Sequence, residues 1–266
     1  KIYTHLTLQA KPQRPQLVIW PETSAPFFFQ SPSSFQTKVL DLSSQMGTPL
    51  LLGAPGFERQ GAKIEYYNSA FLISPEKKII GRYDKLHLVP FGEYAPLSGI
   101  FGFTKDIIGP MGDFAPGLGI RNLTVPFGDF GVLICYEAIF PDLTRRFVAG
   151  GARFLVNITN DAWFGKTSAP HQHLSMVTLR AIENRVPIAR AANTGFSALI
   201  DSSGEIQAAS DLFTREVLSG TINLRQTPSL YTRYGDLFAY ACLGVTALGI
   251  LIIRFRRGYR VERRKR

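Results

Sequence analysis

Apolar and polar residues alternate along the chain in short blocks, a pattern that predicts strands interleaved with helices. Apolar runs predict strands over residues 17–20, 49–54, 63–74, 78–83, 120–126, 130–134, 153–159, 186–192, 196–201 and 205–209. Helical spacing predicts helices over residues 35–46, 141–149 and 170–184, and residues 1–11 have the pattern of a helix end. This mixture, without a glycine-rich phosphate loop or a CxxC pair, indicates an α/β domain with a large sheet content.

One apolar run near the end of the chain is longer than the others. Residues 237–253, LFAYACLGVTALGILII, carry no charge, and a helix of this length rises about 25 Å, close to the thickness of a bilayer core. A buried core helix is the alternative, but such helices rarely end in RFRRGYRVERRKR. We therefore expect a transmembrane helix, with the basic tail in the cytoplasm and the body on the other side of the membrane.

The distribution of charge argues against a nucleic-acid partner. Residues 254–266 contain eight Arg or Lys and one Glu, which accounts for +7 of the net charge of +10. The charge that remains on the body is too small for a nucleic-acid footprint. Because the chain opens at Lys1 inside a predicted helix with no signal peptide before it, we also expect upstream sequence that takes the body across the membrane.

Cys135 stands where the strand over 130–134 ends, just before a helix that begins around Pro141. It is followed by two polar residues, Tyr136 and Glu137. A small buried hydrophobe is the commoner role for a free cysteine. The second cysteine, Cys242, falls inside the apolar run over 237–253, so Cys135 is the single thiol of a body predicted to be exported, where a spare thiol is unusual. The sequence therefore favours a reactive thiol.

Two further ionisable residues follow predicted strands. Glu22 comes directly after the run that ends at Trp20 and Pro21, and Lys85 follows the strand over 78–83. Each has an ordinary alternative, because Glu22 suits a solvated loop and Lys85 suits a surface pair with Glu93.

A long loop over 94–119 contains the apolar residues Ile100, Phe101, Phe103, Ile107 and Ile108. Two interpretations remain open for this loop. It forms a lid or a surface that dips into lipid, or it packs on the body.

Glu22, Lys85 and Cys135 are the minimum set for acyl transfer through a thioester. An unperturbed thiol is mostly protonated at neutral pH, so a nucleophilic cysteine needs a base and a cation. Glu22 can take the thiol proton and return it to the leaving group. Lys85, helped by the backbone N–H of Tyr136, can stabilise the thiolate and the oxyanion of the tetrahedral intermediate.

The order Glu, Lys, Cys resembles the nitrilase superfamily of carbon-nitrogen hydrolases. WPE at 20–22, YDKLHLVPFGEY at 83–94 and ICYEAIFPDL at 134–143 are similar to its three signature segments. The resemblance implies an α-β-β-α sandwich with Glu22 as base, Lys85 as oxyanion stabiliser and Cys135 as nucleophile. It also implies supporting roles for Glu93, Tyr136 and Glu137. The expected segments are then a nitrilase-like catalytic domain over 1–228, a juxtamembrane segment and transmembrane helix over 229–254, and a cytoplasmic tail over 255–266.

Within that superfamily, VPFGEYAP, the CYE at 135–137, the NDAWFG at 160–165 and the terminal apolar helix resemble the apolipoprotein N-acyltransferase family. The resemblance implies a bacterial inner-membrane enzyme, multi-pass in full length, with its catalytic domain on the periplasmic side. Such an enzyme moves a fatty acyl chain from a phospholipid to Cys135, and then to the α-amine of a diacylglyceryl-cysteine lipoprotein. No metal or organic cofactor is expected, because His171 and His173, two residues apart on a helix, point to different faces.

Two alternatives remain open at this point. A membrane-tethered amidase of the carbon-nitrogen hydrolase type would use the same Glu22, Lys85 and Cys135 but release the acyl group to water. A non-catalytic membrane protein that kept the fold would function without Cys135. The second is disfavoured because all three residue types follow strands, where the chemistry needs them.

Overall fold

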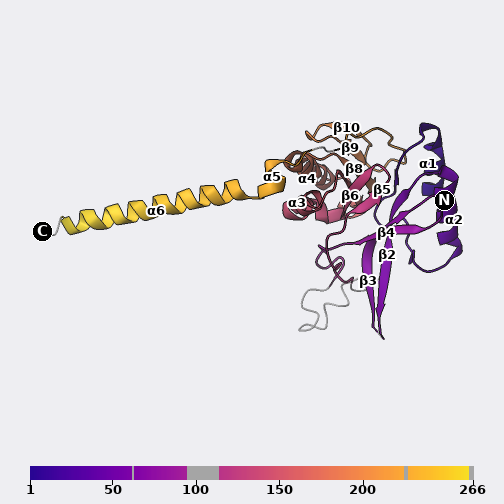
Figure 1. The fold of residues 1–266 in the computed structure, drawn as a ribbon, viewed down its shortest axis with the longest axis horizontal. Helices are drawn as coiled ribbons and strands as arrows, with labels where there is room; N and C mark the ends of the chain where they lie inside the picture. Colours follow the sequence, from indigo (N-terminus) through magenta and orange to yellow (C-terminus); the bar gives the residue numbers. More distant parts are fainter. Residues whose placement is uncertain (62, 95–113, 225–226, 264–266) are drawn as a thin grey trace.

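The computed structural model describes residues 1–61, 63–94, 114–224 and 227–263, and these form four layers (Figure 1). Helices α1 (Ile2–Gln9) and α2 (Ser34–Met46) lie outside one sheet, and α3 (Pro141–Ala149) and α4 (Ala169–Asn184) lie outside the other. The two sheets face each other between the helix layers. The predicted α-β-β-α sandwich is confirmed.

The first sheet has the strand order β1-β2-β3-β4. Strand β1 (Val18–Ile19) pairs in parallel with β2 (Leu50–Gln60), which forms antiparallel pairs with β3 (Lys63–Ile73), and β4 (Ile79–Asp84) closes the order. Strand β2 is longer than the predicted 49–54, because Pro55 and Gly56, which indicate a turn in the sequence, keep their pairing with Asn68 and Tyr67.

The second sheet has the strand order β10-β9-β8-β7-β6-β5. Its parallel centre consists of β6 (Gly128–Ile134), β7 (Phe154–Asn160) and β8 (Ile188–Asn193). Strand β5 (Leu123–Val125) pairs with β6, and β9 (Ala198–Ile200) and β10 (Ile206–Ala209) follow β8, all antiparallel. The carboxyl ends of the parallel strands therefore meet at one edge of the sheet, where β6 leads into Cys135 and β7 into Asp161.

Alternating side chains of the first sheet supply two separate apolar cores. Leu51 and Leu72 point inward and belong to a core that also contains residues of the second sheet and of α3 and α4. Leu50, Leu52 and Phe71 point outward into the core beneath α2. The inward-facing core therefore holds the two sheets in register.

Gly53 on β2 brings the loop that carries Glu22 against the first sheet. A Cβ atom at this position would lie 2.6 Å from Glu22 Cα and 2.7 Å from the backbone nitrogen of Thr23. Only glycine permits this approach. The backbone of Glu22 therefore packs directly against β2 of its own sheet.

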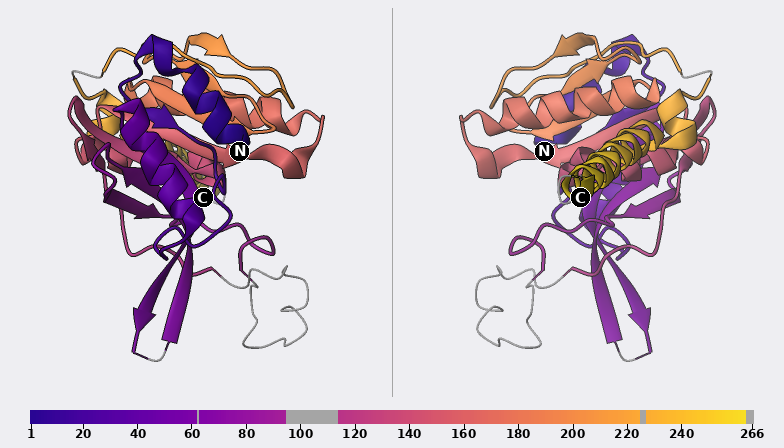
Figure 2. Two further views of the ribbon diagram at one scale, coloured as in Figure 1. Left: turned by 90° about the vertical axis from the view of Figure 1, so that its right-hand side faces the viewer. Right: turned by 90° about the vertical axis from the view of Figure 1, so that its left-hand side faces the viewer.

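The chain ends in a helix that leaves the sandwich. After the short helix α5 (Leu230–Tyr234), α6 (Leu237–Arg263) extends away from the body (Figure 1). Its segment Leu237–Arg254 is long and apolar enough to cross a membrane, and none of it is buried. Helix α4 runs across the direction of α6 (Figure 2). The predicted loop over 94–119, with its five apolar residues, lies largely outside the described residues.

Candidate active site

Glu22 is held in place by hydrogen bonds from both sheets. It follows β1 and is only 7% exposed, so the alternative of a solvated loop acid is wrong. Asn68 of β3 donates from Nδ2 to Oε1 of Glu22 at 2.7 Å. The backbone N–H of Asn160, at the end of β7, donates to Oε2 at 2.9 Å. The carboxylate therefore bridges the two sheets.

Lys85 sits between two carboxylates. Its side chain is 1% exposed, and Nζ lies 2.9 Å from Glu93 and 3.6 Å from Oε1 of Glu22. Asn68 Nδ2 also donates to Glu93 at 2.7 Å, and the backbone N–H of Val89 holds the second oxygen of Glu93 at 2.8 Å. The pair of Lys85 and Glu93 is therefore buried and not an exposed surface pair. Glu93 fixes the ammonium beside Glu22.

Cys135 begins the short 3-10 helix η3 (Cys135–Ile139), at the carboxyl end of β6. Its φ of +53° lies in the left-handed region, which is unfavourable for a residue with a Cβ. Such strained positions persist only where the surroundings hold them, and they cluster at active sites. The residue is half-buried, and Tyr136 after it is 39% exposed and packs edge-on against Phe140.

Glu137 ties the segment that carries Lys85 to the turn that carries Cys135. It is fully buried and accepts hydrogen bonds from the backbone N–H groups of Ile134 at 2.8 Å and Leu86 at 2.7 Å. The hydroxyl of Tyr83 donates to it at 2.8 Å. Burial raises the pKa of Glu137 to about 7, although these donors favour the charged form. Its hydrogen bonds therefore join the backbone before Cys135 to the backbone after Lys85.

A second buried polar network lies behind the cysteine. Arg190 of β8 donates to Asp161 at 2.7 Å, and both side chains are fully buried. One ring nitrogen of His173 lies 3.1 Å from Asp161 Oδ1, and the other lies 3.2 Å from the backbone carbonyl of Cys135. Although burial acts in the opposite direction, His173 and Arg190 together lower the pKa of Asp161. The network holds the strained cysteine backbone through its carbonyl oxygen.

Glu22 and Lys85 have opposite effects on the pKa of the Cys135 thiol. Burial, and then the charge of Glu22, raise the pKa of Cys135 to about 12, although Lys85 and a hydrogen bond with Thr159 act in the opposite direction. Burial alone would lower the pKa of Lys85, but Glu22, Cys135 and Glu93 together raise it above its usual value. At neutral pH the site therefore holds a protonated thiol beside an ammonium group. A protonated thiol can act as a nucleophile only when a base removes its proton.

We expect the Cys135 thiol to stay protonated throughout the neutral pH range, because its pKa is raised to about 12. The thiolate absorbance in the ultraviolet, taken as the difference from Cys135→Ser, should appear only in strongly alkaline solution. In Glu22→Gln the same titration should shift to lower pH, because a neighbouring negative charge has been removed. An ordinary thiol titration near pH 8.5 in the unchanged protein would contradict this expectation.

The structure brings Glu22, Lys85 and Glu93 together and places Cys135 and Glu137 beside them.

Sequence reasoning missed Asn68, Asp161 and Arg190, and it considered His173 only as a metal ligand. His173 instead faces Asp161 and the Cys135 carbonyl, whereas the ring of His171 packs edge-on against Phe196. No cluster of three or more His, Cys, Asp or Glu that could hold a metal occurs among the described residues. Asn160 ends β7 and Asp161 follows it, so a polar residue at the end of a strand, the signal that pointed to Glu22, could also have identified Asp161.

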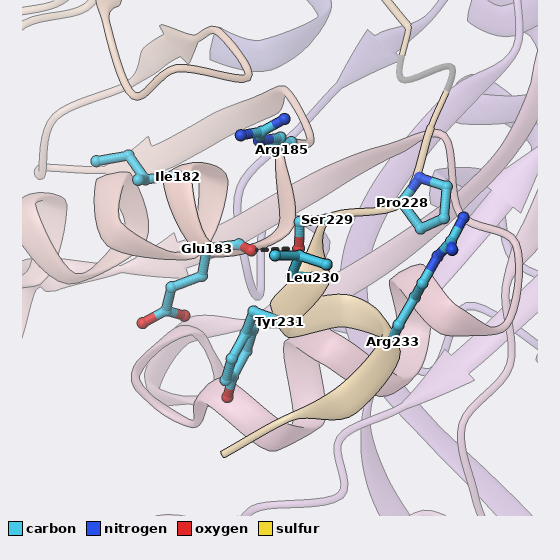
Figure 3. Close-up of a pocket in the computed structure, with 8 residues that line it drawn as sticks. All are labelled: Ile182, Glu183, Arg185, Pro228, Ser229, Leu230, Tyr231 and Arg233. Atoms are coloured by element: carbon cyan, nitrogen blue, oxygen red, sulfur yellow. Dashed lines mark hydrogen bonds between the residues drawn. The ribbon is translucent and has the colours of Figure 1, made fainter. Parts of the chain in front are cut away.

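A pocket of about 510 Å³ lies elsewhere, between the end of α4 and α5 (Figure 3). None of Glu22, Lys85 and Cys135 lines it. Ser229 Oγ donates to the backbone carbonyl of Glu183 at 2.6 Å, and Tyr231 lines the same pocket. These contacts attach α5 to α4 just before α6 begins. The pocket therefore lies where α5 leads into the terminal helix. The candidate active site lies near the opposite end of α4, where His173 contacts Asp161 and Cys135.

The chain matches one protein family and is similar to several proteins of that family. Residues 4–231 match the family model described as carbon-nitrogen hydrolase. The apolipoprotein N-acyltransferase of Geobacter metallireducens is 47% identical over 257 residues, which are 96% of this chain and 49% of that protein. That of Agrobacterium fabrum is 42% identical over 231 residues, which are 82% of this chain and 43% of that protein. The chain therefore spans about half the length of the curated relatives it matches.

Solved structures share the fold. A carbon-nitrogen hydrolase from Helicobacter pylori G27 is similar with a TM-score of 0.59 and 20% identity over 78% of each chain. A mutant of the amidase from Nesterenkonia sp. AN1, in which acrylamide has added to the active site cysteine, has a TM-score of 0.61 and 18% identity. That match covers 90% of this chain and 91% of the amidase. At these identities the likeness concerns the fold alone.

Proposed function

The chain belongs to the carbon-nitrogen hydrolase family, and from this premise we propose that it carries the catalytic site of a membrane-bound N-acyltransferase. The acyl donor is a membrane phospholipid, and the acceptor is the N-terminal amine of a diacylglyceryl-cysteine lipoprotein. Relatives that are 47% and 42% identical and bear the name apolipoprotein N-acyltransferase support acyl transfer to an amine of a lipoprotein. The exposed apolar helix α6 supports it as well, since a membrane-anchored enzyme meets lipid substrates directly.

In the first half-reaction the sulfur of Cys135 attacks an ester carbonyl of the phospholipid while Glu22 takes the thiol proton. The ammonium of Lys85 and the backbone N–H of Tyr136 stabilise the oxyanion that forms. Collapse of the tetrahedral intermediate breaks the ester C–O bond, and Glu22 returns the proton to the departing lysophospholipid. The product is a thioester between the fatty acid and Cys135.

In the second half-reaction the amine of the lipoprotein attacks the thioester carbonyl. Glu22 takes a proton from the amine and passes it to the Cys135 sulfur as the C–S bond breaks, so the thiol is regenerated and an amide is formed. Glu93 and Glu137 act as supporting residues, because they hold Lys85 and the cysteine turn. The reaction is a ping-pong acyl transfer that needs no redox partner.

The single observation that carries this proposal is the placement of Lys85 between the carboxylates of Glu22 and Glu93, fully buried and electrostatically coupled to Cys135. A buried charged cluster of this kind is costly to maintain for structure alone. A buried lysine whose pKa is raised by neighbouring carboxylates, next to a thiol whose pKa is also raised, is instead typical of catalytic sites.

The exposed apolar helix α6 and the basic segment after it support an arrangement in the membrane that is part of the same proposal. The nitrilase-like domain over 1–228 lies on the periplasmic side of the bacterial inner membrane, residues 229–254 lead into and cross the bilayer, and the basic segment over 255–266 lies in the cytoplasm. The full-length protein crosses the membrane several times. The neighbours of the domain are then phospholipid and exported lipoprotein.

The proposal is tested by the mass of the Cys135 peptide after the protein, in membranes, is incubated with phospholipid. We expect a fatty-acyl adduct that persists in water and disappears when a diacylglyceryl lipopeptide is added, and Cys135→Ala should show none. An adduct that hydrolyses without an amine would instead favour the tethered amidase. Absence of any adduct would contradict the assignment of Cys135 as nucleophile.

A further inference from the structure

The inner face of the first sheet continues beyond the sandwich along the hairpin of β2 and β3. Ala70 and Leu72 of β3 face the second sheet in the common core. Because side chains alternate along a strand, Asn68, Tyr66 and Ile64 share that face toward the hairpin tip. Figure 1 shows the hairpin projecting from the body. A face that is buried inside the sandwich therefore becomes exposed outside it.

The exposed part of this face is aromatic and apolar. Phe57 of β2 lies opposite Tyr66, and the ring of Phe28 packs against both, with centroids 5.6 Å from Phe57 and 5.4 Å from Tyr66. Phe28 is 40%, Tyr66 37% and Ile64 38% exposed. We call these four residues, Phe28, Phe57, Tyr66 and Ile64, the aromatic strip. None of the four belongs to either apolar core.

The strip begins at the candidate active site. Asn68, which contacts both Glu22 and Glu93, is two residues from Tyr66 on the same face. At the rise of a β-strand, Tyr66 lies about 7 Å and Ile64 about 13 Å further along the hairpin. Phe28 joins from the loop that follows Glu22. An extended apolar group attached at the site would therefore meet the strip in succession.

The backbone beside the strip is already paired at its centre. The N–H of Ala115 donates to the carbonyl oxygen of Tyr66 at 2.7 Å, and β2 occupies the other edge of β3 along its whole length. An extended peptide therefore cannot add to β3 at Tyr66 by strand pairing. Side chains alone remain to make contact, which favours an occupant without backbone polar groups.

We propose that the aromatic strip holds the fatty acyl chain of the donor and then of the Cys135 thioester. This inference rests on the acyl transfer proposed above and names the surface that recognises its substrate. Apolar surface next to a buried charged site is stabilised when an apolar chain covers it. The strip also gives the acyl chain a place to lie while the lysophospholipid leaves and the amine arrives.

The test compares acylation of Cys135 by a long-chain phospholipid and by a phospholipid with two-carbon acyl chains. In Phe28→Ser combined with Tyr66→Ser, we expect the rate with the long-chain donor to fall about tenfold or more, because contacts with several methylenes are lost. The rate with the short-chain donor should stay within about twofold. Phe28→Leu should retain most of the long-chain rate. Ile80→Ser, an exposed change on β4, is the matched control and should alter neither.

The outcomes separate this inference from the function on which it rests. An unchanged long-chain rate in the double variant would overturn the acyl-chain surface, and so would an equal loss with both donors, since that pattern indicates a damaged site. If neither donor acylates Cys135 in the unchanged protein, the acyl transfer itself fails. A selective loss with the long-chain donor supports both.

Discussion

Glu22→Gln should form the Cys135 thioester about 10²- to 10⁴-fold more slowly than the unchanged protein, the range that a positioned general base contributes. Glutamine has the same shape but only one acceptor oxygen, so just one of the two donors, Asn68 Nδ2 or the Asn160 N–H, keeps its acceptor. The change therefore removes the proton acceptor and one hydrogen bond, while the size of the side chain is kept. The measurement is the single-turnover rate at which the acyl mass appears on Cys135.

A matched control for this result is Glu76→Gln, in an exposed turn between β3 and β4, which should leave the rate unchanged. The thermal midpoint of Glu76→Gln should stay close to that of the unchanged protein, whereas that of Glu22→Gln should fall by a few degrees because one buried donor loses its acceptor. A rate for Glu22→Gln within a few-fold of normal, with the fold intact, would remove Glu22 as the base. The role would then pass to another group near the thiol.

Arg190→Met should lower the free energy of unfolding by about 3 to 5 kcal/mol, because it leaves the Asp161 carboxylate buried without its cationic partner. The side chains of Arg190 and Asp161 are both fully buried, 2.7 Å apart. Arg190 also donates from Nε to the carbonyl of Phe196 at 3.0 Å and to Asn157. For a domain of this size the loss corresponds to a fall in the thermal midpoint of roughly 6 to 20 °C.

Two further variants test whether the loss of stability comes from the buried pair of Arg190 and Asp161. Arg190→Lys keeps the charge but loses part of the fork of contacts, so its thermal midpoint should fall between those of Met and Arg. Arg121→Met, at an exposed arginine, should change the stability by no more than about 0.5 kcal/mol. If Arg190→Met melts at the same temperature as Arg121→Met, the buried pair does not stabilise the fold.

Most of the fold was accessible from the sequence because its signals are local. The helix predicted over 141–149 matches α3, since Pro141 starts it and glycines follow it. The helix predicted over 35–46 differs from α2 by one residue, where Ser33 caps its beginning. Strand β2 was predicted too short because Pro55 and Gly56 carry the local signal of a turn. Their strand conformation depends on pairing with β3, which a local pattern does not contain.

The candidate site was partly accessible for the same reason. Glu22, Lys85 and Cys135 each follow a strand, which is visible in one dimension. Arg190 lies within a buried strand and Asn68 within a hairpin strand, and no spacing rule connects either of them to Cys135. His173 was visible as a residue, but its role depends on the distance from α4 to the cysteine turn. Contacts between elements that are far apart in sequence decide all three.

The residues of the candidate site come from both sheets of the sandwich, so apolar residues between the sheets also affect the geometry of the site. Glu22, Asn68 and Lys85 lie on or just after strands of the first sheet, and Cys135, Asn160 and Asp161 lie on or just after strands of the second. The reacting distances are therefore set by how far apart the sheets rest. Leu51 and Val132, which have no polar side-chain atom, help set that spacing from the common core. In this molecule a methyl group removed from the middle of the core should therefore also change the distances among Glu22, Lys85 and Cys135.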